Sequence, residues 1–73
     1  MSVLTVELAD LVKQRALNAV RELDSIVGLT RDQCSPEDFE VLRRGVGLSI
    51  GRIQTELLDP IFRSFPELDD LRD

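Results

Sequence analysis

Histidine, tryptophan and tyrosine are absent from this chain, and cysteine occurs once, as Cys34. Without histidine and with one thiol, the sequence can supply neither a Ser-His-Asp or Cys-His catalytic set nor a tetrahedral zinc site. A lone cysteine also excludes an internal disulfide and leaves any redox cycle without a resolving thiol. We therefore expect no enzymatic activity, no metal, no cofactor and no small-molecule substrate, with Cys34 as a free thiol.

Long apolar runs and an excess of basic residues are also missing. No apolar stretch approaches the roughly 18 residues that a membrane span requires, and the first residues show neither a basic region nor a signal-cleavage pattern. These features predict a cytoplasmic protein. The net charge of −5 argues against nucleic acid and anionic membranes as partners. Nucleic-acid binding is kept as a remote alternative, because Arg43, Arg44 and Arg52 form a local positive cluster.

With 73 residues, the chain forms one domain that is too short to bury a large core by itself. Small domains compensate with disulfides, metals or partner chains. The first two are excluded above, so the length predicts association with another chain.

Apolar residues recur at spacings of three and four from the N-terminus to Val27, which predicts one long amphipathic helix. Gly28 follows the last of them and is typical of a left-handed helix end. We predict a helix over residues 3–27 and a connection over 28–35. The stripe consists of Leu4, Leu8, Leu11, Val12, Ala16, Ala19, Val20, Leu23, Ile26 and Val27.

A second helix is predicted to start at Ser35-Pro36, with the serine as N-cap and the proline in the first turn. It should extend over residues 36–58. Asp59-Pro60 then predicts a kink or break with Asp59 as a new N-cap, because proline disrupts a helix interior by about 3 kcal/mol. A short helical turn over 60–65 and an acidic tail over 66–73 follow. The tail is expected either to dock through Leu68 and Leu71 or to be loose.

The second helix carries two apolar stripes. The main stripe has coiled-coil spacing and the second lies opposite or well to its side. The first helix can cover only one of them, which predicts a second chain. The main stripe is Phe39, Leu42, Val46, Ile50, Ile53, Leu57 and Ile61, and the second is Val41, Leu48, Leu58, Phe62 and Phe65.

Small residues interrupt the second helix at Gly45, Gly47, Ser49 and Gly51. Each mid-helix glycine costs about 1 kcal/mol relative to alanine, so their clustering calls for a reason. We favour close approach of a helix from another chain. The alternatives are packing of large side chains from the first helix against them, and a flexible hinge.

Two arginine positions have competing interpretations. Arg44 is expected to pair with Glu40 at the i,i+4 spacing, although the arginine cluster could also bind an anionic site on a protein partner. Arg15 lies at the edge of the first apolar stripe. It could extend along the surface with its charge in water, or form a partly buried ion pair with Glu56 or Asp59.

The sequence therefore predicts an all-α antiparallel two-helix hairpin with a proline-kinked C-terminal end, which dimerises into a four-helix bundle. The expected function is protein–protein interaction, as an adaptor, regulator or inhibitor, with a self-assembling structural subunit as the alternative. The predicted helix-packing and dimer interface is Val46, Gly47, Ile50, Gly51, Ile53 and Leu57. The predicted surface for another protein is Leu48, Arg52, Leu58, Phe62 and Phe65.

Overall fold

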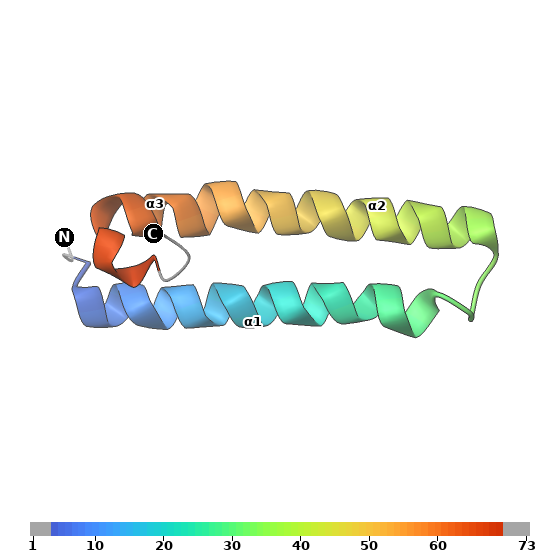
Figure 1. The fold of residues 1–73 in the computed structure, drawn as a ribbon, viewed down its shortest axis with the longest axis horizontal. Helices are drawn as coiled ribbons and strands as arrows, with labels where there is room; N and C mark the ends of the chain where they lie inside the picture. The colour runs from blue at the N-terminus through green and yellow to red at the C-terminus, as the bar shows by residue number, and fades with distance from the viewer. Residues whose placement is uncertain (1–3, 70–73) are drawn as a thin grey trace.

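The computed structural model describes residues 4–69, and they form a two-helix hairpin (Figure 1). α1 spans Val6–Thr30 and α2 spans Pro36–Ile53, and the two helices run antiparallel in a single layer. Every regular element in residues 4–69 is helical. The predicted all-α, two-helix architecture is thereby confirmed.

α1 begins with a side-chain cap and ends later than predicted. The Thr5 hydroxyl accepts a hydrogen bond from the backbone N–H of Leu8 at 3.1 Å. Gly28 lies inside the helix, and no glycine in the described part of the chain has a positive φ. The expectation of a left-handed end at Gly28 is wrong, because right-handed backbone continues through it to the C-cap at Arg31. The connection is correspondingly short.

The start of α2 is as predicted. Ser35 adopts an extended conformation, and its hydroxyl accepts the backbone N–H of Asp38 at 3.1 Å. Pro36 occupies the first turn, where its missing N–H leaves no hydrogen bond unmade.

The helix does not break at Asp59-Pro60. Instead α2 passes into a π-helical turn, η1 (Gln54–Leu58), and then into α3 (Asp59–Ser64). Asp59 is helical, with φ −60° and ψ −45°, and its N–H bonds to the carbonyl of Gln54 five residues back. The wider turn accommodates a proline that cannot donate to the carbonyl four residues before it. The predicted N-cap at Asp59 is therefore wrong.

The π turn changes which side chains face α1. One extra residue in a turn sets every later residue back by roughly 100°. This rotation brings Leu58 into the core, at 3% exposure, although a straight helix would point it away from the main stripe, and Ile61 is also buried, at 6%. Val41 and Leu48 precede the turn and stay exposed. The second stripe is thus divided between core and surface, and the main stripe is only partly covered, because Leu42 and Leu57 are 40% and 46% exposed.

The C-terminal end folds back onto α1. After Phe65, a 3₁₀ turn η2 (Pro66–Leu68) brings the chain to Lys13, whose ammonium donates to the carbonyl of Leu68 at 2.7 Å. Lys13 is buried, with 8% of its surface exposed. Leu68 is half-buried and docked against α1, which was one of the two alternatives predicted for the tail. Leu71 lies outside the described residues.

The hairpin leaves an unusually large surface in water. Its accessible area is 5788 Å², whereas a compact monomer of 8.2 kDa exposes about 4,500 Å². The radius of gyration of 15.3 Å also exceeds the roughly 11 Å of a compact domain of this length. No large side chain of the described residues is completely buried. The intrachain core is accordingly a narrow seam of Ala9, Ala16, Val46, Leu58 and Ile61.

Candidate interaction face

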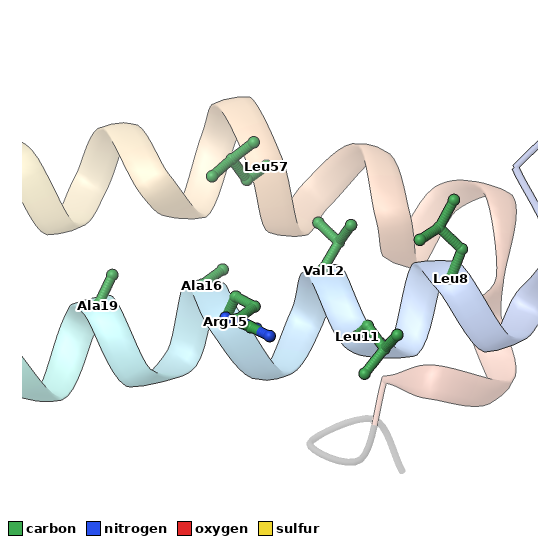
Figure 2. A pocket seen from close by; sticks show the side chains of 7 residues that line it. All are labelled: Leu8, Leu11, Val12, Arg15, Ala16, Ala19 and Leu57. Atoms are coloured by element: carbon green, nitrogen blue, oxygen red, sulfur yellow. The ribbon is translucent and has the colours of Figure 1, made fainter.

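An apolar groove runs along the N-terminal half of α1 (Figure 2). Leu8 and Leu11 are about half exposed on one side of it, and Leu57 reaches in from η1 on the other. Its volume of about 440 Å³ would suit a small ligand. However, the groove is an open trough, and among residues 4–69 Arg15 is the only charged residue that lines it. Such a surface can take up apolar side chains of another protein but offers little to orient a small molecule.

A second groove lies on the same face, toward the other end of the hairpin. Ile26 lines the second groove and Ala19 the first, and these residues are seven apart, so they point in nearly the same direction from α1. Together the two grooves make one surface, called here the open face. It comprises Leu8, Leu11, Val12, Arg15, Ala19, Leu23, Ile26, Leu42, Gly45, Ser49 and Leu57.

The C-terminal segment covers the opposite side of the hairpin. Its anchor, Lys13, is two residues from both Leu11 and Arg15, which places it about 200° around α1 from each. No element of residues 4–69 therefore crosses the open face. The sequence does carry a signal for this face, because the apolar stripe of α1 extends over about 180°, more than one neighbouring helix covers.

The predicted dimer interface does not form one exposed surface. Val46 is 7% exposed against α1, and Ile50 and Ile53 are half-buried along the same intrachain seam. These three side chains therefore pack between the helices of one chain, and the structure does not show them at an interface with a second chain. Gly47 and Gly51 are exposed on the side away from the open face, and only Leu57 belongs to that face.

The glycines have no close neighbour within the chain. A methyl group added at Gly28, Gly45, Gly47 or Gly51 would meet no atom within 4 Å outside its own helical surroundings. Packing of large side chains from α1 against the glycines is therefore wrong. Close approach of a second chain stays a prediction, and only Gly45 and Ser49 lie on the open face.

The predicted surface for another protein is also divided. Leu48, at 65% exposure, and Arg52 are open to solvent. Leu58 belongs to the core, and Phe62 and Phe65 are half-buried, because the π turn rotates all three toward α1. Leu58 is thus removed from the candidate surface.

Glu40 pairs with Arg43 instead of the predicted Arg44. Arg43 donates from Nε and Nη2 to the carboxylate at 2.8–3.1 Å. This hydrogen bonding lowers the pKa of Glu40 and raises the pKa of Arg43. Arg52 and Glu56 approach to 4.0 Å on the exposed surface. Exposed pairs of this kind contribute little stability, and they explain part of the arginine cluster without an anionic ligand.

Arg15 is exposed in the groove and has no ion pair within residues 4–69. The alternative of an intrachain pair with Glu56 or Asp59 is therefore wrong. The sequence indicated that Arg15 lies at the edge of the apolar stripe, but only the structure shows that its charge lies among the exposed leucines of the groove.

Other chemistry is sparse in the described chain. Residues 4–69 contain no group of three potential metal ligands, and none of their helices is both long and apolar enough to cross a bilayer. The Cys34 thiol is half-buried and donates to the carbonyl of Thr30 at 3.3 Å. Comparison of the chain with protein-family models, curated proteins and solved structures gives no match.

Proposed function

We propose that this chain is a small, non-enzymatic protein–protein interaction module that works as a homodimer, with two hairpins packed into a four-helix bundle. The supporting observation is the exposed area. The chain exposes roughly 1,200 Å² more than a compact monomer of its mass. A stable interface buries about 800 Å² on each partner, so covering the open face would remove about two thirds of this excess.

The composition of the open face supports the same proposal. Large apolar side chains gather there along the 47 Å length of the hairpin, and small residues at Gly45 and Ser49 lower its profile. Contiguous apolar patches of several hundred Å² on a small chain mark interaction sites. A helical surface of this length fits another helical pair better than it fits a compact ligand.

A second partner is favoured over a purely structural role by one observation. Val41 and Leu48 are 70% and 65% exposed and lie seven residues apart on the outer side of α2. Val41 also lines the second groove, whereas Leu48 lines neither groove, so dimerisation through the open face leaves Leu48 in solvent. Leu48, with Val41 at the edge of the open face, forms the ridge through which the dimer would contact a different protein.

The test is the solution mass by light scattering, from high to low micromolar concentration. We expect wild type to have twice the chain mass and Leu11→Asp to be a folded monomer, because an aspartate on the open face would be buried unpaired on dimerisation. Leu48→Asp is the matched control, since it replaces another exposed leucine, at 65% against 51% for Leu11, outside that face. A wild-type monomer at every concentration would refute the homodimer.

A further inference from the structure

Four exposed residues of α1 have a symmetric order, and the first and second of them, Leu8 and Arg15, line the open face. Leu8, Arg15, Glu22 and Leu29 follow one another at intervals of seven, so all four point in similar directions from the helix. All four are exposed in the chain. Reversing the order gives the same pattern except that the two charges exchange places.

We infer that α1 of one chain packs antiparallel on α1 of a second copy, with Arg15 of each chain paired to Glu22 of the other. This register rests on the homodimer proposed above. Its two-fold axis passes between positions 18 and 19, so residues at equal distances on either side of that point face each other. Leu8 then meets Leu29 of the second copy, and Leu11 meets Ile26.

The axial distances agree with this arrangement. Arg15 and Glu22 each lie 3.5 positions from the axis, which is about 5 Å along the helix. Both charges are therefore close to the centre of the contact, where leucine pairs on either side exclude water from them. Ala19 and Asn18 lie nearest the axis. Ala19 is small and permits close approach of the helices, and Asn18 is polar.

Charge complementarity selects the antiparallel arrangement. If the two α1 helices were parallel and in register, Arg15 would face Arg15 and Glu22 would face Glu22, and like charges at close range weaken binding. In the antiparallel register the same four charges make two attractive pairs. Among residues 4–69 neither Arg15 nor Glu22 has an ion pair inside its own chain, so both are available to the second copy.

The apolar area also supports a second copy as the occupant. Leu8, Leu11 and Leu29 are 47%, 51% and 70% exposed in the chain. In an isologous contact the copies of these leucines on both chains are buried, and each copy faces an apolar side chain of the other chain. A different partner would need to carry the mirrored order of apolar and charged groups, whereas a second copy carries it already.

The experiment compares the dimer dissociation constants of wild type, Arg15→Glu, Glu22→Arg and the double variant by sedimentation. Each single variant places two like-charge pairs at the contact, and we expect weakening by roughly 10- to 100-fold. The double variant restores both attractive pairs and should recover to near the wild-type value. Positions 15 and 22 do not contact each other within one helix, so recovery cannot come from an intrachain pair.

Mixing the two single variants provides a second measurement. Arg15→Glu and Glu22→Arg chains are each weakened as homodimers, but together they form a heterodimer with two attractive pairs. We expect the mixture to dimerise nearly as tightly as wild type. Arg44→Glu, at an exposed position of α2 outside the open face, is the control for the change in net charge and should leave the dissociation constant within about twofold of wild type.

The outcomes separate the two proposals. A wild-type monomer would overturn both the homodimer and this register. A wild-type dimer that is indifferent to the single variants would overturn the register and leave the homodimer standing. Single and double variants that all dimerise with the wild-type dissociation constant, together with a mixture of the two single variants that dimerises more tightly than wild type, would indicate parallel α1 helices and would also overturn the register.

Discussion

Leu58→Ala tests whether the π turn rotates the end of the second helix into the core. Leu58 is 3% exposed, so the substitution removes three buried carbon atoms from the narrowest part of the hairpin. Buried leucine-to-alanine changes cost about 2–5 kcal/mol. We expect about 2–3 kcal/mol here, because a thin, partly open core can relax into the space that is left.

Leu48→Ala is the matched control for this change. Both leucines belong to the apolar stripe that a straight helix would place away from α1, but Leu48 is 65% exposed. Its truncation should change the free energy of unfolding by less than about 0.5 kcal/mol. Urea denaturation at one fixed chain concentration measures both, since dimerisation makes stability depend on concentration. Equal losses for the two variants would refute the rotation of Leu58 by the π turn.

Three further predictions follow from the described contacts. Gly47→Ala should raise the free energy of unfolding by about 0.5–1 kcal/mol, because the added methyl group meets no neighbour and alanine is the better helix former. Thermal melting measures this change, and a lower melting temperature would instead support close approach of another chain. Lys13→Met should release the segment around Leu68, since the 2.7 Å hydrogen bond is lost, and limited proteolysis should then cut there faster than in wild type. The pKa of Glu40 is lowered by Arg43, so this pair favours the folded state above the unfolded pKa of the carboxyl, and its contribution disappears as the pH falls through the lowered value. NMR titration of Glu40 should show that lowered pKa in wild type and the ordinary one in Arg43→Gln.

The case for a second chain changed its basis between sequence and structure. From the sequence, α1 is expected to cover only one of the two apolar stripes of the second helix. In the structure, α1 buries part of each stripe, because the π turn adds Leu58 to the core while Leu42 and Leu57 of the main stripe stay exposed. The excess apolar surface lies instead on α1, at Leu8 and Leu11, and supports the same expectation of a partner from a different face.

The glycine-rich segment shows a limit of one-dimensional patterns. Spacing of small residues indicates that a helix surface is low, but it does not indicate what lies against that surface. Gly45 and Ser49 border a groove, whereas Gly47 lies on the other side of the helix with open space around it. Two residues along a helix correspond to about 200°, so neighbouring glycines need not serve one contact.

Local chemistry determined the hairpin from the sequence alone. The period of the apolar residues set both helices, and the hydroxyl of Ser35 with Pro36 set the start of the second, because capping involves only atoms within one turn. Tertiary structure decided the rest. Whether Pro60 breaks the helix or is accommodated by a π turn depends on the packing gained by turning Leu58 toward α1. Tertiary structure also decides which half of the wide apolar stripe of α1 stays exposed. The position of the second helix and the return of Leu68 to Lys13 determine it, and both depend on contacts between residues far apart in the sequence.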